Sequence, residues 1–256
     1  MIHPTAIIDP SATLAEDVSV GPYSVIGAAV EIDSGCEIAS HVVIGDSTRM
    51  GKNNRIFQFS SVGEVAQDLK YAGEESFLEI GDDNVIREFV TLHRGTAHGG
   101  SYTRIGDHNL FMAYAHVAHD CQVAHHTIFS NAASIAGHVK VDDYAILGGF
   151  TCVHQFSHIG AHAFSGLGTI INRDVPPFVM VAGNHASAYG INKRGLKRRG
   201  FSDELIQALH QTFKLLVKNR GARDEALLKV KLLAEEHRQV KHLLEFIEGS
   251  ERGIVR

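Results

Sequence analysis

Histidine is the residue type in this sequence best suited to chemistry. The chain holds 17 histidines, and many of them lie between residues 116 and 162: His116, His119, His125, His126, His138, His154, His158 and His162. Imidazole titrates near neutral pH, so a histidine can take a proton from a hydroxyl or amine nucleophile. The cluster therefore indicates a general base, unless these side chains only decorate a polar surface.

Two other polar segments could contact a substrate. Gln67, Asp68 and Lys70 place an amide, a carboxylate and an ammonium within four residues, although such a segment is equally typical of a solvated loop. The run from Asn192 to Arg199 holds five cations in a chain whose net charge is -5. Guanidinium groups match phosphate oxygens, so this run predicts a phosphate or diphosphate site, with a solvated linker as the alternative.

The elements that must position these residues follow a six-residue repeat. An aliphatic residue or Phe recurs at every sixth position: Ile105, Phe111, Val117, Val123, Phe129, Ile135, Val141, Leu147, Val153 and Ile159. This period fits neither an α-helix nor an alternating strand. The fourth residue after each anchor is usually small, as at Ala115 and Ala133. The pattern predicts a β-solenoid of hexapeptides, with three hexads in a triangular coil and a spacing between coils of about 4.8 Å.

Residues one coil apart should stack in columns on the outer surface. His119, Gly137 and Gln155 form one such column, and Asp120, His138 and Phe156 form the next. Gly137 has no side chain, so a substrate carbonyl could approach its backbone above His119 and accept a hydrogen bond from its N–H. We expect His116, His138, His154 and Gln155 to lie close to His119. Neighbours on a strand point to opposite sides, so Asp120 is not assigned as the group that orients His119.

A metal site is the alternative interpretation of the histidines. His154, His158 and His162 recur at every fourth position, and His116 and His119 form a close pair, so both sets could suggest zinc ligands. In a solenoid coil, however, a spacing of four residues does not bring two rings to one face as it would in a helix. We therefore expect no metal.

The repeat divides the chain into two parts. Residues 1–190 are expected to form the solenoid, with loops ejected at 63–79 and 93–104, where the pattern pauses. Residues 191–256 are expected to form a small helical domain that covers the open end or a flank of the solenoid. Its helices should begin after the N-cap Ser202, break at Gly221, and continue over 224–239 and 240–248.

Composition excludes several classes of protein. A net charge of -5 argues against a nucleic-acid binder. The opening residues MIHPTAIIDP lack the features of a signal peptide, and no apolar run approaches the roughly 18 residues of a membrane span. Cys36 and Cys121 fall on small inward positions, so with Cys152 we expect three buried or half-buried thiols in a reducing, cytoplasmic compartment.

Several segments resemble the acyl-carrier-protein-dependent UDP-N-acetylglucosamine O-acyltransferases of lipid A biosynthesis. The matching segments are FQFSSVGEVAQDLKYAGE (57–74), IREFVTLHRGT (86–96), HVAHDC (116–121), AGHVKVDDYAILGG (136–149), VHQF (153–156), GNHA (183–186) and GLKRRGFS (195–202). They span most of the chain in order. Hexads alone occur in many acetyltransferases, whereas HxxHDC together with QDLKYAGE and GLKRRGFS is specific to this family.

The resemblance implies a left-handed parallel β-helix that forms a cytoplasmic homotrimer with active sites between subunits. His119 would be the general base, and the Gly137 amide the oxyanion donor. The remaining contacts that the resemblance implies are Gln67, Asp68 and Lys70 from the neighbouring subunit's loop, His116, His138, His154 and Gln155 at the substrate, and Asn192, Arg198 and Arg199 at the nucleotide.

The chain departs from the family's pattern at two positions. Arg194 stands where the family commonly has an acidic residue near the uridine. Leu167 stands where family members that use long acyl chains have glycine, at the far end of the acyl tail. His185 stands at the other position that sets acyl-chain length, and there the residue is the same as in the family. A larger side chain closes a groove early, so Leu167 predicts a preference for shorter acyl chains.

The expected reaction moves an (R)-3-hydroxyacyl group from acyl carrier protein to the 3-hydroxyl of the glucosamine unit of UDP-N-acetylglucosamine. We expect direct transfer without a covalent enzyme intermediate, because Cys121 points inward and no other nucleophile is activated. The carrier's phosphopantetheine would hold the donor, and no cofactor of the enzyme's own is expected. Alternatives are the sister N-acyltransferase, which uses an amine acceptor and normally has an extra N-terminal domain, and a non-catalytic solenoid that binds ligand or carrier protein.

Overall fold

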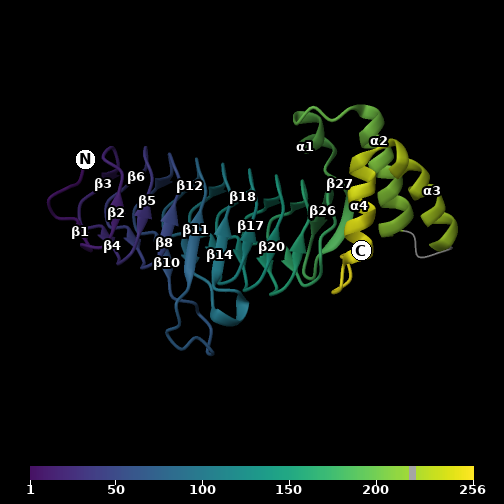
Figure 1. Ribbon diagram of the computed structural model, residues 1–256. Coiled ribbons are helices and arrows are strands. Elements are labelled where there is room, and N and C mark those ends of the chain that lie inside the picture. Colours follow the sequence, from purple (N-terminus) through teal and green to yellow (C-terminus); the bar gives the residue numbers. More distant parts are fainter. Residues whose placement is uncertain (219–222) are drawn as a thin grey trace.

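The computed structural model describes residues 1–218 and 223–256. Figure 1 shows short strands that follow one another along an elongated body, with helices at one end. Successive strands turn through three sheets, and up to residue 171 they pair in parallel, each with a strand three places away. The strand at 179–182 then joins the strand at 164–165 in parallel and pairs antiparallel with the last strand, at 187–191. The fold is the expected left-handed parallel β-helix followed by α-helices.

The three sheets form the faces of a triangular coil. The first face comprises β1 (Ile7–Ile8), β4 (Val25–Ile26), β7 (Val43–Ile44), β10 (Ser61–Glu64), β13 (Thr91–His93), β16 (His116–Val117), β19 (Ser134–Ile135), β22 (Cys152–Val153) and β25 (Ile170–Ile171). The second face comprises β2 (Thr13–Leu14), β5 (Glu31–Ile32), β8 (Thr48–Met50), β11 (Phe77–Ile80), β14 (Tyr102–Ile105), β17 (Gln122–Val123), β20 (Lys140–Val141) and β23 (His158–Ile159). The third face comprises β3 (Ser19–Val20), β6 (Glu37–Ile38), β9 (Arg55–Ile56), β12 (Val85–Ile86), β15 (Leu110–Phe111), β18 (Ile128–Phe129), β21 (Ile146–Leu147), β24 (Phe164–Ser165), β26 (Val179–Ala182) and β27 (Ser187–Ile191).

The predicted anchors form the core of the solenoid. Every anchor from Ile105 to Ile159 is buried, and Phe111 and Phe129 stack with ring centroids 4.8 Å apart. The small partners Ala115 and Ala133 are also fully buried. At the N-terminal end Ile2 is exposed, because no coil covers the first one from below.

Left-handed backbone at the corners lets each coil turn sharply. Many non-glycine residues there have positive φ, among them Asp120 at 60°, His138 at 61° and Phe156 at 61°. Asp, Asn and His tolerate this region better than most side chains. A residue in this conformation no longer follows the alternation of a strand, which becomes important at the site.

Both ejected segments leave the coil at the corner between the first and second faces, which we call the loop-bearing corner. Ser61 pairs with Thr91, although a regular coil would pair it with the residue 18 positions later. The extra residues are therefore accommodated in the ejected segment, and the strands on either side keep their six-residue pattern. The segments span 65–76 and 94–101, and are therefore shorter than the predicted 63–79 and 93–104. The predicted loops were too long because their last residues belong to strands: β11 and β14 pair over four residues, and Phe77 stacks on Tyr102.

A ladder of buried polar side chains runs through the coils that carry these insertions. Asn54 Oδ1 accepts a hydrogen bond from the Asn84 backbone N–H at 2.9 Å, and Asn84 Oδ1 accepts one from the Asn109 backbone N–H at 2.9 Å. Asn109 Oδ1 in turn accepts bonds from the N–H and hydroxyl of Thr127, both at 2.7 Å. Each of these buried groups is thus satisfied by the neighbouring coil.

Helices follow the solenoid. They are α1 (Lys193–Arg198), α2 (Asp203–Thr212), the π-helical segment η2 (Phe213–Lys218), α3 (Arg223–Glu236) and α4 (Arg238–Gly249); a short 3-10 helix, η1 (Ala97–Gly99), lies in the second ejected segment. Ser202 caps α2 as predicted, accepting a bond from the Leu205 N–H at 3.2 Å. The predicted boundary between helices at 239/240 is wrong: the break lies at His237. The predicted break at Gly221 lies outside the described residues.

The C-terminal residues return to the solenoid. Ile254 bridges Asp174 in parallel, and the Ser250 hydroxyl donates to Asp174 Oδ2 at 2.6 Å. The boundary chosen at 190/191 falls inside β27, whose residues pair with β26. No described helix combines the length and the apolar character that a membrane crossing requires.

Candidate active site

The loop-bearing corner brings the main site residues together. His119 and Asp120 form the turn between β16 and β17, and Gly137 and His138 form the same turn one coil later. Both ejected segments leave from the coils just before these turns. The corner is therefore the place where the regular repeat and the inserted residues meet.

His119 lies against the bare backbone of Gly137, as the column argument predicted. A Cβ atom built on Gly137 would lie 2.6 Å from His119 Cε1 and 2.8 Å from Nε2. No side chain larger than hydrogen fits there without moving the imidazole. Among the described residues, the Gly137 N–H donates to no acceptor. A polarised carbonyl oxygen could therefore accept a hydrogen bond from it.

Asp120 holds the His119 ring, contrary to the assignment from sequence. Its Oδ2 lies 2.7 Å from His119 Nδ1. The strand rule failed because Asp120 is a turn residue with φ of 60°. A carboxylate only accepts hydrogen bonds, so Nδ1 carries the proton and Nε2 is left as the basic nitrogen. The basic nitrogen is thus close to Gly137.

The Asp120 carboxylate is itself fixed by Thr96 of the second ejected segment. The Thr96 N–H donates to Oδ1 at 2.8 Å, and its hydroxyl donates to Oδ2 at 2.7 Å. Burial alone would raise the pKa of Asp120, but the hydrogen bonds from His119 and Thr96 outweigh it and lower that pKa. Asp120 therefore stays negatively charged and can stabilise a protonated His119.

Two further predicted histidines surround this pair. His138 meets the His119 ring edge-on at 5.2 Å and stacks on Phe156 at 4.4 Å. His116 Nδ1 lies 2.8 Å from the Thr91 hydroxyl. Burial, with smaller contributions from His93 and His119, lowers the pKa of His116 to about 4. The His116 ring is therefore neutral at physiological pH.

The first ejected segment brings Asp68 to the site within one chain. Asp68 Oδ2 lies 3.3 Å from His98 Nε2. The pKa of Asp68 is lowered mainly by the hydrogen bond that its carboxylate accepts from the Lys70 backbone N–H, with smaller contributions from the charges of His119 and His98. Asp68 thus already lies beside this corner within its own chain, and its arrival at the site of a neighbouring subunit stays a prediction. Gln67 and Lys70 are exposed on the same segment. His98 could not be identified from the sequence, because the six-residue repeat does not place residues of the ejected segments.

His154 and Gln155 do not join the cluster around His119. Both are exposed at the turn two coils later. The contacts of His154 are with the Gln155 carbonyl at 3.0 Å and with Arg252 Nη2 at 3.2 Å. Arg252 comes from the returning C-terminal residues. The predicted patch is therefore compact only around His116, His119, Asp120 and His138.

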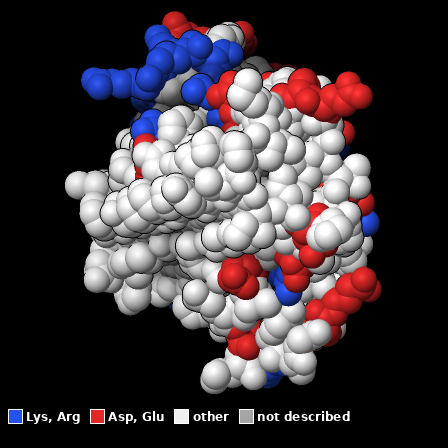
Figure 2. All heavy atoms as spheres, turned by 90° about the vertical axis from the view of Figure 1, so that its left-hand side faces the viewer, with Lys and Arg blue, Asp and Glu red and all other residues white. Residues whose placement is uncertain are grey.

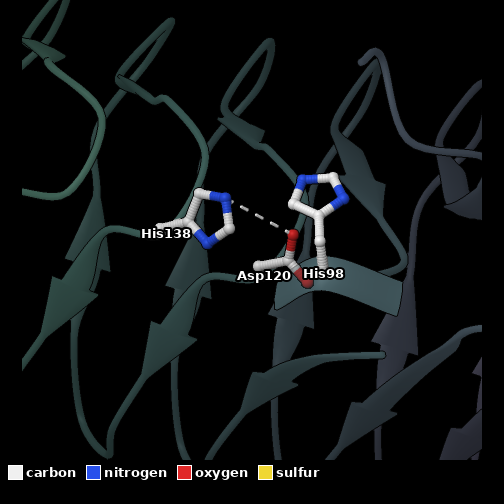
Figure 3. Close-up of side chains that lie close together, drawn as sticks. All are labelled: His98, Asp120 and His138. Atoms are coloured by element: carbon white, nitrogen blue, oxygen red, sulfur yellow. Dashed lines mark ion pairs between the residues drawn. The ribbon is translucent and has the colours of Figure 1, made fainter. Parts of the chain in front are cut away.

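The histidines spaced by four residues have separate surroundings. His158 Nε2 lies 2.8 Å from Asp142 Oδ1, and His162 stacks between Tyr144 and Phe178 at another corner. Within residues 1–218 and 223–256, the cluster that comes closest to a metal site consists of His98, Asp120 and His138, whose ligand atoms lie within 4.8 Å of one another (Figure 3).

The predicted phosphate residues lie over the third face and not at the corner that holds His119. Asn192 caps α1, accepting a hydrogen bond from the Gly195 N–H at 3.1 Å, so this run is a helix and not a linker. With Arg194, Arg198 and Arg199 it borders a cavity of about 590 Å³ over the third face. Figure 2 shows Lys and Arg gathered on the side where Figure 1 places α1. The third face lies opposite the loop-bearing corner.

Leu167 and His185 are both exposed. Leu167 is 77% exposed, and its Cδ1 atom lies 3.0 Å from a Cβ built on Gly149, one coil below. His185 lies between β26 and β27. No described contact joins either residue to the His119 cluster.

The cysteines supply no activated nucleophile. Cys121 is fully buried, and burial raises its pKa to about 12. Cys36 is also buried, whereas Cys152 is exposed, which corrects the expectation of three buried or half-buried thiols. Cys152 lies one residue before its anchor and points outward. All three thiols are free.

Comparisons with known proteins agree on one family. A family model described as UDP N-acetylglucosamine O-acyltransferase, domain 2, matches residues 174–255, and a bacterial transferase hexapeptide model matches residues 11–46. The chain is 52% identical, over 255 residues, to the acyl-[acyl-carrier-protein]–UDP-N-acetylglucosamine O-acyltransferase of Thiobacillus denitrificans, covering 100% of this chain and 99% of that protein.

Solved structures give the same result over the whole chain. LpxA from Acinetobacter baumannii superposes with a TM-score of 0.96 at 49% identity, and UDP-N-acetylglucosamine O-acyltransferase from Moraxella catarrhalis with a TM-score of 0.96 at 44% identity. Each comparison covers 100% of this chain and 99% of the other. The likeness therefore includes the C-terminal helices as well as the solenoid.

The lowered pKa of His116 predicts acid sensitivity of the fold. Between an ordinary histidine pKa of about 6.5 and the folded value of about 4, the unfolded chain binds more protons, so stability falls as the pH is lowered through this window. We expect His116→Gln to reduce the loss of stability between pH 7 and pH 5, measured by denaturant unfolding. An unchanged pH dependence in the variant, together with a His116 NMR titration near pH 6.5, would contradict this assignment.

Proposed function

The chain belongs to the UDP-N-acetylglucosamine O-acyltransferase family, and we propose that it transfers an (R)-3-hydroxyacyl group from acyl carrier protein to the 3-hydroxyl of the glucosamine unit of UDP-N-acetylglucosamine. This would be the first step of lipid A biosynthesis. The observation that carries the proposal is the basic His119 Nε2 beside the unpaired Gly137 amide, with His119 Nδ1 tied to Asp120 at 2.7 Å.

The chemistry is a single displacement. His119 Nε2 takes the proton from the sugar 3-hydroxyl as that oxygen attacks the thioester carbonyl. The Gly137 N–H donates to the oxyanion, and Asp120 stabilises the imidazolium. Collapse of the intermediate forms the ester and breaks the carbon–sulfur bond. The leaving thiolate takes the proton from His119, which regenerates the neutral base.

The residues around the base are proposed to contact the substrate. In this proposal His116 and His138 face the sugar beside His119, and Asp68 from the ejected segment closes the site. Gln67 and Lys70, exposed on the ejected segment, and His154 and Gln155, exposed two coils beyond His119, remain proposed substrate contacts. The donor is carried on the phosphopantetheine of acyl carrier protein, and the proposal requires no cofactor of the enzyme's own. A cytoplasmic location accords with three free thiols.

An active site shared between subunits is part of the proposal. Asn192, Arg198 and Arg199 border a cavity over the third face, opposite the corner that holds His119. One chain therefore cannot offer the base and these cations to one nucleotide sugar. A neighbouring copy in a homotrimer could place its α1 beside the loop-bearing corner, which would supply phosphate-binding groups next to the base.

Loss of the base should abolish transfer without unfolding the protein. We expect His119→Ala to lower kcat by at least about 10²-fold, because a general base typically contributes 10²–10⁴-fold. Asp120→Asn should lower kcat less, since it keeps the shape of the side chain but removes its charge. The assay follows thiol release from acyl carrier protein with UDP-N-acetylglucosamine, and circular dichroism checks the fold.

The matched control is His125→Ala, which removes another histidine that lies beside an aspartate: His125 Nδ1 is 3.0 Å from Asp107 Oδ2 at a different corner. It should keep near-normal transfer. Activity only with the deacylated amine sugar would instead indicate the N-acyltransferase, and no thiol release with either sugar would indicate a binding module. Full activity of His119→Ala would refute the assigned base.

Mixing two impaired variants tests the shared site. We expect His119→Ala and Arg198→Ala each to be impaired alone, and co-refolded mixtures to regain part of the activity, because some interfaces then combine an intact base with an intact cation. Mixed assemblies can be verified by differently tagged chains. Mixed trimers without recovered activity would show that both groups act within one chain.

Leu167 is proposed to limit the length of the acyl chain. Its side chain is 77% exposed, so it is free to contact an acyl chain that lies along the coil. We expect Leu167→Gly to shift the preferred donor toward longer chains, and the control Leu167→Met to leave it near the wild-type length, because its volume is similar. Competition among acyl donors, read by mass spectrometry, measures the preference. An unshifted preference in Leu167→Gly would rule out this role.

A further inference from the structure

We propose that His98, Asp120 and His138 bind one divalent transition-metal ion, and that the bound ion inhibits the enzyme by taking Asp120 away from His119. The inhibitory effect rests on the proposed function, whereas the binding itself does not. His98 belongs to neither the six-residue repeat nor the residues assigned to catalysis. It lies in η1 of the second ejected segment.

The three side chains already lie at distances close to those of a metal site. Their ligand atoms are within 4.8 Å of one another, and His138 Nε2 is 3.7 Å from Asp120 Oδ2 (Figure 3). Two ligands that bind one zinc ion at about 2.0–2.2 Å are roughly 3.5 Å apart in a tetrahedral site. Asp120 and His138 therefore have nearly the required separation, and His98 has to move only slightly.

Two of the ligands are held in place and one is adjustable. The Asp120 side chain is completely buried and fixed by Thr96, and the His138 ring is supported by Phe156 at 4.4 Å. The His98 side chain is 43% exposed on the ejected segment, so it can swing toward an ion. Its exposed side also leaves room for water to complete the coordination.

The ligand types select the class of metal. Two imidazoles and one carboxylate suit zinc, copper, nickel or cobalt, whereas magnesium and calcium prefer a set of oxygen ligands. Asp68 lies 3.3 Å from His98 Nε2 and adds a second negative charge beside the cluster. This charge favours a dication over the metal-free state.

Metal binding disrupts the hydrogen bond between His119 and Asp120. Asp120 Oδ2 already accepts hydrogen bonds from His119 Nδ1 and from the Thr96 hydroxyl, both at 2.7 Å. A carboxylate oxygen offers about two lone pairs, so an ion that binds Oδ2 displaces one of these donors. Thr96 is also held by its N–H bond to Oδ1, whereas His119 has a single bond to Asp120, so His119 is the donor that is lost. Loss of the His119 bond frees the ring from its tautomer and orientation. A bound ion is therefore incompatible with an efficient base.

Cobalt provides a direct probe of the site, since its visible absorption reports imidazole and carboxylate coordination without any assay of activity. Tag-free full-length protein, treated with a chelator, is titrated with Co²⁺ and in parallel with Zn²⁺ by calorimetry. We expect one equivalent to bind to the wild type and His98→Gln to bind at least about tenfold more weakly, since one ligand is lost.

His108→Gln is the matched control. His108 also lies beside an aspartate, with Nδ1 3.7 Å from Asp83 Oδ2, and its side chain is 49% exposed, but it belongs to another corner. It should bind metal as the wild type does. Zinc should lower the transfer rate of the wild type and of His108→Gln, each relative to its own metal-free rate, and a chelator should restore both. His98→Gln should resist the same zinc concentrations.

The outcomes separate the site from the function. Equal cobalt affinity in wild type and His98→Gln would overturn the metal site. Tight binding that leaves the transfer rate unchanged would overturn the displacement of His119. Binding that depends on His98 in a protein that transfers no acyl group would support the site while refuting the proposed function.

Discussion

Parallel pairing between successive coils is the constraint on which the rest of this structure depends. It sets each turn residue one strand spacing, about 4.8 Å, from its counterpart in the next coil. The position of the His119 imidazole under the Gly137 backbone is a direct consequence, because a side chain at position 137 would occupy the same space. A slip of the register by one residue would turn the anchors outward, so burial of the core and geometry of the site are secured together.

The buried carboxylate of Asp120 connects this regular framework to the inserted residues. A buried charge without partners would be costly, yet Thr96 and His119 supply hydrogen bonds to both of its oxygens. The second ejected segment is therefore part of the site's support as well as a connection between two strands. It also brings His98 to the same carboxylate. Asp120 therefore orients the base and, in our inference, can instead bind a metal ion together with His98.

Most of the solenoid and the central column could be predicted from sequence, because both follow from a period. The buried anchors and the stacking of His119 on Gly137 needed only residue spacing. Asp120 was misjudged because φ at a turn cannot be deduced from the period, and His98 was missed because ejected residues have no column. The α1 helix was missed because Gly195 and a run of cations resemble a linker; its cap, Asn192, was treated only as a possible phosphate contact. Assembly lies beyond any single-chain pattern.

The ladder of Asn54, Asn84, Asn109 and Thr127 crosses both insertions, since Asn84 Oδ1 receives the Asn109 amide from a coil displaced by 25 positions instead of 18. Hydrophobic anchors alone are interchangeable, and a coil could pair with the wrong neighbour at little cost. A buried amide that must meet a specific amide above and below is far less tolerant. The ladder thus specifies which coils pair on either side of the insertions. The ejected segments can therefore differ in length and composition without changing the register of the solenoid beneath them.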